Sequence, residues 1–146
     1  MAGQRPDSNP CLGFLSYLLG IENIQQLFRD PLRGNWIENL VVVELVKARL
    51  NNNLDPNLYY FRDNHQHEID VIFKFGSKLV PIEIKASQTF NTDFLKELRY
   101  FEKLAFNRVS ESYLIYAGDQ ERTIGNVHVK NFKHAHLIVE QEPCKK

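Results

Sequence analysis

Two carboxylates and a lysine stand where they could do chemistry together. Asp70 lies in the apolar stretch 68–75, and Glu83 and Lys85 lie in the stretch 78–86. Both stretches are rich in β-branched and aromatic residues, which predicts two strands. A close pair of carboxylates suits a hard cation such as Mg²⁺, and a lysine beside it can polarise a water molecule or hold a phosphate. These three residues are the smallest set of side chains that metal-assisted cleavage of a phosphodiester requires.

A hairpin would decide how these side chains face one another. Gly76 and Ser77 separate the two stretches, and glycine at the first position of a two-residue loop suits a type II′ turn. Pairing outward from this turn places six apolar side chains on one face of the hairpin: Ile69, Val71, Phe73, Val80, Ile82 and Ile84. The same register places Asp70 directly opposite Glu83 on the other face. Because like charges opposite each other destabilise a sheet, we expect a divalent cation to neutralise the pair.

A fourth carboxylate, Glu38, lies in the segment 36–50, which contains no Gly or Pro and is the strongest helix candidate. On a helical wheel it shares its side with apolar residues, Val41, Val42 and Leu45. A carboxylate on an apolar stripe needs a partner or a metal ion. The alternative is that Glu38 stabilises the N-terminus of its helix through the helix dipole. The sequence does not decide between these two hypotheses.

Helices and strands alternate along the rest of the chain. The expected helices are 11–19, 22–28, 36–50 and 92–105, the last with Thr92 as its N-cap. The expected strands are 58–62, 68–75, 78–86, 112–116, 126–132 and 136–139. This order predicts an α/β fold with a mixed central sheet flanked by helices. We expect a single domain over residues 11–146, after a flexible segment of ten residues.

Composition sets limits on the function. A chain of 146 residues can bury a core of its own, and eighteen basic against eighteen acidic residues give no net charge. That balance excludes a histone-like coat of positive charge but not a local stripe that binds nucleic acid. Cys11 and Cys144 lie near opposite ends without metal-ligand spacing, which favours a reducing, cytoplasmic location. No apolar run approaches the length of a membrane span, so no membrane association is expected.

The ordered set of residues resembles the PD-(D/E)xK superfamily, which includes Holliday-junction resolvases and restriction endonucleases. That set is Glu38, Glu68-Ile69-Asp70 and Ile82-Glu83-Ile84-Lys85-Ala86-Ser87. More narrowly, the chain resembles a domain of unknown function found C-terminal to the ATPase module of bacterial and archaeal AAA-type ATPases. This resemblance covers residues 7–132 and rests on Leu18-Leu19-Gly20-Ile21, Gly34-Asn35-Trp36-Ile37-Glu38-Asn39, Glu44-Leu45, Lys47, Tyr60-Phe61-Arg62-Asp63 and Pro81-Ile82-Glu83-Ile84-Lys85.

The resemblance implies a restriction-endonuclease-like core in which Asp70 and Glu83 hold one or two Mg²⁺ or Mn²⁺ ions. It also implies that Lys85 is the catalytic lysine and that Glu38 supports the metal or its water. Such ATPases carry a phosphate-binding loop upstream, and this sequence contains none, so no nucleotide is expected to bind here. The chain is then expected to be the C-terminal part of a longer ATPase. Nucleic acid and the upstream ATPase domain would be its partners, and it stays open whether a homodimer is needed.

Three basic residues are weaker candidates for contacts with substrate phosphates. Arg62 could contact a phosphate at the site entrance, or form a local ion pair with Asp63 that is worth little if exposed. Lys96 and Arg99 line one side of the helix 92–105 and could meet a nucleic-acid backbone, although a solvated face is the favoured interpretation.

Other polar and aromatic residues have simpler explanations. His65 and His67 are expected in a solvated turn rather than at a metal site. The aromatic residues Tyr59, Tyr60, Phe61, Tyr100 and Phe101 are expected in the core or at an interface rather than as platforms for bases. Two hypotheses therefore remain for the whole chain. One is a metal-dependent nuclease, and the other is a non-catalytic interaction or regulatory domain of an AAA-type ATP-binding protein.

Overall fold

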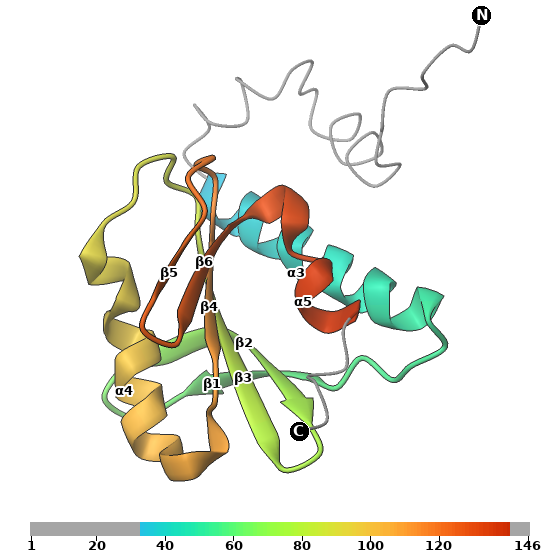
Figure 1. Ribbon diagram of the computed structural model, residues 1–146, viewed down its shortest axis with the longest axis horizontal. Helices are drawn as coiled ribbons and strands as arrows, with labels where there is room; N and C mark the ends of the chain where they lie inside the picture. The colour runs from blue at the N-terminus through green and yellow to red at the C-terminus, as the bar shows by residue number, and fades with distance from the viewer. Residues whose placement is uncertain (1–32, 141–146) are drawn as a thin grey trace, which may run out of the picture. The chain divides into compact units, whose positions relative to one another are not determined.

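The computed structural model describes residues 33–140. The helices expected at 11–19 and 22–28, and the first ten residues, lie outside this range. The helices and strands are α3 (Arg33–Asn51), β1 (Leu58–Arg62), β2 (Glu68–Phe75), β3 (Lys78–Lys85), α4 (Lys96–Ala105), β4 (Ser112–Tyr116), β5 (Arg122–Ile124), β6 (Val127–Asn131) and α5 (Leu137–Glu140) (Figure 1). Short 3₁₀ turns occupy Thr92–Leu95, Phe106–Arg108 and Phe132–His134.

Six strands form one mixed sheet in the order β1-β2-β3-β4-β6-β5. Strand β2 runs antiparallel to both β1 and β3, whereas β3, β4 and β6 run parallel to one another. Strand β5 returns antiparallel to β6. The predicted α/β fold with a mixed sheet is therefore confirmed. Parallel strands share one edge for their carboxyl ends, which is where ligand sites of α/β sheets usually lie.

Helices cover both faces of the sheet, with α4 on one side and α3 and α5 on the other (Figure 1). A core cluster lies under α4: Ile69, Ile72, Leu95, Leu98, Phe101, Leu114, Tyr116, Val127 and Val129. Successive side chains of a strand point to opposite faces, so Phe73 points away from this cluster. The Arg49 guanidinium of α3 lies 5.0 Å from the centre of the Phe73 ring and donates to the Val139 carbonyl of α5 at 3.4 Å. These contacts hold α3 and α5 on the second face.

Helix α3 forms because its apolar residues recur at helical spacing. Its buried apolar side chains are Ile37, Leu40, Val41, Leu45 and Ala48. This stripe packs against the sheet, while the remaining side chains of α3 are partly or fully exposed, apart from the buried Arg49. The predicted helix 36–50 is confirmed with slightly wider bounds.

The helix predicted at 92–105 begins as a 3₁₀ turn and continues as α4. Its N-cap is Asn91, whose side-chain oxygen accepts the Asp93 N–H at 2.9 Å. The prediction of Thr92 as the cap was wrong by one residue. The cap still acts as expected, because a side-chain oxygen satisfies one of the unpaired N–H groups at the start of the helix.

The strand expected at 136–139 is also wrong, because α5 occupies Leu137–Glu140. Ala135 and Val139 are both fully buried and stand four residues apart, which is the spacing of a helix face. In the same region the short strand β5 was not predicted. It pairs with β6 through a turn at Gly125, whose φ of +65° favours glycine. In the described part of the chain, residues 33–140, no helix is long and apolar enough to cross a membrane.

Candidate active site

The β2–β3 hairpin has the predicted turn and most of the predicted register. Gly76 has φ +57° and Ser77 has no positive φ, which agrees with a type II′ turn. Three predicted pairs are present: Phe75 with Lys78, Phe73 with Val80 and Val71 with Ile82. The regular ladder ends at the last of these, so Asp70 and Glu83 do not form the regular cross-strand pair that the sequence predicts.

A β-bulge in β2 explains this departure. Strand β1 pairs Tyr59 with Ile72 and Phe61 with Ile69, so two steps along β1 match three steps along β2. The extra residue falls next to Asp70. As a result Ile69 packs in the same cluster as Ile72, under α4. Its predicted place on the opposite face of the hairpin was wrong, because the bulge reverses the alternation there.

Asp70 uses one carboxylate oxygen to complete the sheet. Its Oδ2 accepts the backbone N–H of Ile84 in β3 at 2.7 Å, where a regular strand would offer a carbonyl. Burial raises the pKa of Asp70, although the Ile84 bond and the charge of Lys85 oppose this shift. The bulge and this bond together fix the carboxylate of Asp70 against β3.

Glu83 is the most deeply buried carboxylate of the site, with 3% of its surface exposed. It lies in the middle of the sheet, where its register partner on β4 is Leu114. Its Oε1 accepts a hydrogen bond from the Lys85 ammonium at 2.5 Å, while its buried Oε2 has no hydrogen-bond partner among residues 33–140. Burial raises the pKa of Glu83 to about 7, and the nearby charge of Asp70 adds to the shift. A buried acceptor without a donor is costly unless a cation or a proton satisfies it.

Lys85 is the counter-charge within the site. Burial alone would lower its pKa, but the carboxylates of Glu83, Asp70 and Glu38 outweigh burial and raise it. Its side chain is 37% exposed, against 4% for Glu83. The ammonium group is therefore charged at neutral pH and accessible to a ligand from solvent.

Glu38 reaches the same site from α3. The helix begins at Arg33, so Glu38 lies beyond the first turn, where the helix dipole has little effect on a carboxylate. The capping hypothesis is therefore not supported. Glu38 is exposed as a residue, but partial burial of its carboxylate, the charge of Asp70 and the charge of Glu68 raise its pKa, while Lys85 lowers it. Asp70 and Lys85 of the predicted set thus lie within electrostatic range of both Glu38 and Glu83.

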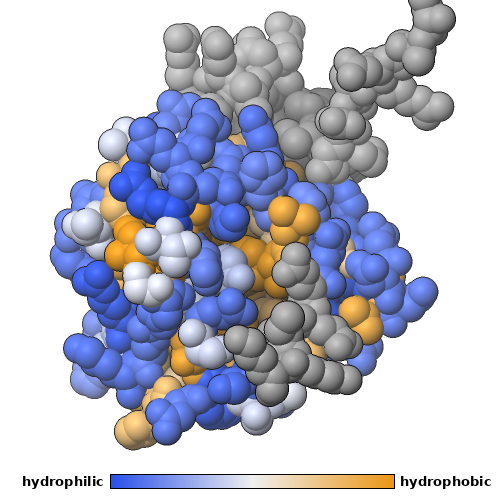
Figure 2. All heavy atoms as spheres, in the orientation of Figure 1, coloured by the Kyte–Doolittle hydropathy of each residue, from blue (hydrophilic) through white to orange (hydrophobic). Residues whose placement is uncertain are grey.

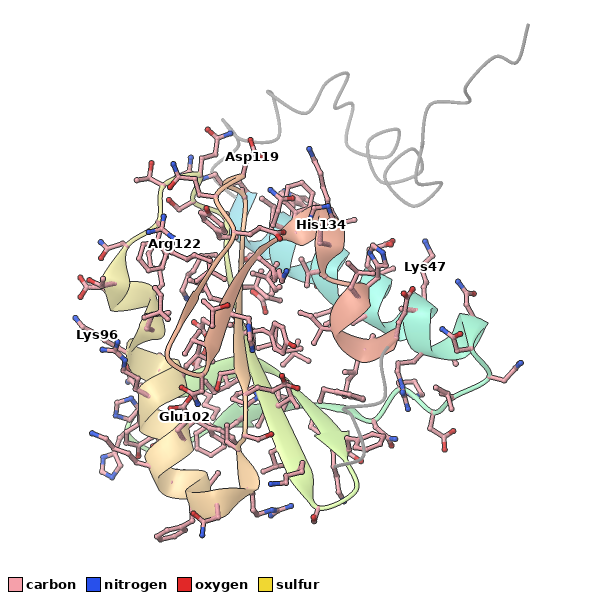
Figure 3. All side chains as sticks on the ribbon, viewed as in Figure 1. Lys47, Lys96, Glu102, Asp119, Arg122 and His134 are labelled. Atoms are coloured by element: carbon pink, nitrogen blue, oxygen red, sulfur yellow. The ribbon has the colours of Figure 1, made fainter. Side chains whose placement is uncertain are left out.

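The other basic candidates are placed differently. Arg62 pairs with Glu68 at 3.0 Å rather than with Asp63, and this pair stands beside the bulge. Lys96 pairs with Asp93 at 2.9 Å, and Figure 3 shows it on the outer side of α4. Arg99 is exposed on the same helix. Arg62 is thus linked to the site only through Glu68, whose charge acts on Glu38 and Asp70, whereas Lys96 contacts Asp93.

Sequence reasoning missed Glu97 of α4. Its charge contributes to the raised pKa of Glu83, and its Oε2 contacts His67 Nδ1 at 2.9 Å. The His67 ring stacks on Tyr100 with centroids 3.8 Å apart, so the predicted solvated turn holds for the exposed His65 but not for His67. The overlooked signal was the place of Glu97 four residues before Phe101, on the apolar side of its helix.

A metal ion fits this site only if waters and substrate phosphates complete its coordination shell. Within residues 33–140, no three side chains of His, Cys, Asp or Glu converge into a ready-made metal-binding group. Mg²⁺, however, commonly binds through one or two carboxylates and completes its shell with waters and substrate phosphates. The unpartnered Glu83 Oε2 and the neighbouring Asp70 match that second arrangement. An ion held by protein ligands alone does not fit.

The fold and this cluster define an α/β domain with a buried carboxylate–lysine site. The chain belongs to the family described as "Domain of unknown function (DUF4143)", whose family model matches residues 33–135. This match confirms the expectation of a domain of unknown function. No curated protein and no solved structure gives a significant match to the chain.

Proposed function

We propose that this domain is a metal-dependent nuclease that hydrolyses phosphodiester bonds of nucleic acid on a PD-(D/E)xK-like core. The observation that carries the proposal is the environment of Glu83. Its carboxylate is almost completely buried, and one oxygen accepts a hydrogen bond from Lys85, while the other has no partner in the described part of the chain. Asp70 stands close enough to raise its pKa further.

A purely structural role gives no reason for this arrangement. Burying a second carboxylate beside the first costs free energy, and an apolar residue of similar size is often at least as stable at such a position. The same arrangement is favourable if a divalent cation binds there, because the cation offsets the repulsion between Asp70 and Glu83. Around them Glu38, Glu68 and Glu97 add further negative charge, which attracts cations to the site.

Each residue then has a role in hydrolysis. Asp70 and Glu83 would hold Mg²⁺ or Mn²⁺, which when bound supplies a Lewis acid for the phosphate. The Lys85 ammonium donates to a phosphate oxygen and stabilises the charge that develops there. Glu38 accepts a proton from the attacking water while the oxygen of that water forms a bond to phosphorus. The bond from phosphorus to the leaving sugar oxygen breaks, and solvent protonates that oxygen.

A cleavage assay tests the proposal. The full chain is incubated with Mg²⁺ or Mn²⁺ and with duplex, single-stranded and branched DNA and with RNA. Lys85→Ala is expected to lower cleavage on the order of 100-fold or more, because it removes charge stabilisation of the transition state. The matched control is Lys96→Ala, an exposed lysine outside the site, which should keep wild-type cleavage. Equal activity of the Lys85 variant and wild type would assign the cleavage to a contaminant or to other residues.

A second candidate function is a non-catalytic interaction or regulatory domain attached to an AAA-type ATPase. It is favoured by the ion pair of Glu83 and Lys85, which partly neutralises the site without any metal. Among the described atoms visible in Figure 2, polar residues predominate and hydrophobic residues show in small separate areas. That face therefore gives this candidate no broad apolar surface. Absence of both metal binding and cleavage, with a stable fold, would favour it over the nuclease.

A further inference from the structure

His67 is a titratable side chain outside the predicted set, and the fold holds its ring in one orientation. The ring stacks on Tyr100 of α4 with centroids 3.8 Å apart, and its Nδ1 lies 2.9 Å from Glu97 Oε2. Its backbone is fixed as well, because Asp63 Oδ1 accepts the His67 N–H at 2.9 Å and the His67 carbonyl accepts the Asp63 N–H at 3.0 Å. The imidazole is therefore held against α4 by contacts on several sides.

The turn that carries His67 is anchored and locally strained. Tyr100 donates its hydroxyl to Asp63 Oδ2 at 2.8 Å, which ties the start of the turn to α4. Gln66, directly before His67, has φ +67°, which is uncommon for a residue other than glycine. Strain of this kind persists only where the surrounding structure over-determines it, and it is frequent at functional sites. The fold thus spends free energy on the position of His67.

His67 lies on the same face of the sheet as Glu83 and Lys85. The register partner of Glu83 on β4 is Leu114, which belongs to the cluster under α4, so Glu83 points toward α4. Lys85 follows two residues later and points to the same face. Glu97 of α4 connects the two groups, because it contacts His67 and its charge acts on Glu83.

Glu38 approaches the site from the other side. It belongs to α3, and α3 and α4 lie on opposite faces of the sheet (Figure 1). Asp70, whose charge acts on Glu38, comes three residues after His67, which is about 10 Å along an extended strand. In an in-line displacement at phosphorus, the attacking and leaving oxygens stand on opposite sides. A base on the α3 side therefore calls for an acid on the α4 side.

We propose that His67 is a further catalytic residue of the candidate active site, the general acid that protonates the leaving sugar oxygen, and that Glu97 positions its ring. This inference rests on the proposed nuclease function. An ionised carboxylate only accepts hydrogen bonds, so Glu97 keeps a proton on Nδ1 and leaves Nε2 to meet the substrate. Carboxylate–imidazole pairs fix the tautomer in the same way in serine hydrolases.

The proton balance of hydrolysis then runs through two side chains. The water oxygen bonds to phosphorus as Glu38 takes a proton from that water, and the electron pair of the breaking bond passes to the leaving oxygen. The imidazolium of His67 gives its Nε2 proton to that oxygen and becomes neutral. Solvent then reprotonates His67 and takes the proton from Glu38, so the proton on the leaving oxygen comes from solvent by way of His67.

Cleavage of two matched oligonucleotides by the full chain with Mg²⁺ tests the inference. One is the substrate that wild type cleaves best, and the other has sulfur in place of its leaving sugar oxygen, as identified from the end groups of the products. A thiolate leaves without a proton, because thiols ionise near neutral pH. His67→Asn has an amide N–H for Glu97 but no Nε2. It should slow cleavage of the oxygen substrate about 100-fold or more and cleave the sulfur substrate like wild type.

Three further variants complete the comparison. Glu97→Gln should show the same selectivity at about 10-fold, because its amide no longer dictates the tautomer of His67. Lys85→Ala should slow both substrates, because its charge acts on the phosphate rather than on the leaving oxygen. His65→Asn is the matched control, since His65 is exposed in the same turn, and it should keep wild-type rates on both. Thermal denaturation checks that each variant is folded.

Unchanged cleavage by His67→Asn, or an equal loss on both substrates, would make His67 a structural residue and overturn the inference. If His67→Asn does not fold, Glu97→Gln decides by the same comparison of substrates. If cleavage depends on Lys85 but neither His67 nor Glu97 discriminates between oxygen and sulfur, the nuclease proposal stands and this inference fails. If wild type cleaves no nucleic acid, both fail together.

Discussion

The carboxylate of Asp70 replaces a backbone acceptor in the sheet, because its Oδ2 accepts the Ile84 N–H at 2.7 Å. The bulge in β2 makes this possible by ending the regular ladder at the Val71–Ile82 pair. One residue thus both closes a gap in the sheet and presents a charge to Glu83. Mutations at Asp70 therefore affect stability and chemistry together, and the choice of substituent separates the two.

Asp70→Ala should destabilise the fold by about 1–3 kcal/mol, because it leaves the Ile84 N–H without an acceptor. Asp70→Asn keeps an acceptor oxygen and removes the charge, so its stability should stay close to that of wild type. Urea denaturation of the three proteins without metal measures both effects. Equal stability of the Ala and Asn variants would show that the bond to Ile84 contributes nothing.

Metal-free protein should lose stability as the pH rises from about 4.5 to about 7. The pKa of Glu83 is raised from 4.5 in the unfolded chain to about 7 in the fold, so within this window the folded state binds more protons. The contribution of Glu83 is therefore most favourable at low pH, and about 1–3 kcal/mol is lost by pH 7. Urea denaturation at a series of pH values gives the free energy of unfolding.

Two variants test whether Glu83 is the group that causes this pH dependence of stability. Glu83→Gln should flatten the decline between about pH 4.5 and 7, because the group that titrates is gone. Asp93→Asn, a change at an exposed carboxylate outside the site, should keep the wild-type profile. Saturating Mg²⁺ should also flatten the decline in wild type. A decline that persists in Glu83→Gln would assign the titration to another group.

Gly118 closes the loop after β4 against the loop after β3. A Cβ there would lie 2.3 Å from the Gln88 carbonyl oxygen and 2.4 Å from a ring carbon of the buried Tyr116. Gly118→Ala should therefore cost about 1–3 kcal/mol and lower any activity, because the displaced loop directly follows Lys85. Gly34→Ala is the control, since nothing lies within 4 Å of its Cβ position. Thermal and urea denaturation compare the two.

Glu121 should stabilise the fold at neutral pH and lose this effect in acid. Burial would raise its pKa, but hydrogen bonds from His134 at 2.6 Å, the Asn131 N–H and Lys130 lower it to about 2. The stabilisation is complete above about pH 4.5 and disappears as the pH falls through about 2. Glu121→Gln should cost about 1–2 kcal/mol at pH 7 and almost nothing near pH 2, as measured by urea denaturation.

The sequence predicted the fold class and the hairpin because both depend on local patterns. The Gly76-Ser77 turn and the apolar alternation around it fix the pairs from Phe75–Lys78 to Val71–Ile82. The prediction failed at Ile69, because a bulge depends on the neighbouring strand β1 and has no signature within β2 itself. The α5 helix was missed because a short apolar run such as Leu137-Ile138-Val139 fits a strand equally well.

The sequence predicted which residues make up the candidate site, but it did not predict the contacts between them. Predicted pairing placed Asp70 opposite Glu83, whereas the structure brings the two together through a side-chain bond to Ile84. Glu97 comes from α4, and only the packing of that helix on the sheet reveals its closeness to Glu83. Such long-range contacts arise from tertiary packing, which the period of a single element does not encode.

Calorimetric titration of the full chain with Mg²⁺ and Mn²⁺ tests the central claim most directly. We expect wild type and Lys85→Ala to bind, and Asp70→Asn and Glu83→Gln to lose binding while staying folded. Asp70→Asn is the sharper control, because it keeps the bond to Ile84 and removes only the charge. Binding that survives in both carboxylate variants, or no binding to wild type, would contradict a metal site at Asp70 and Glu83.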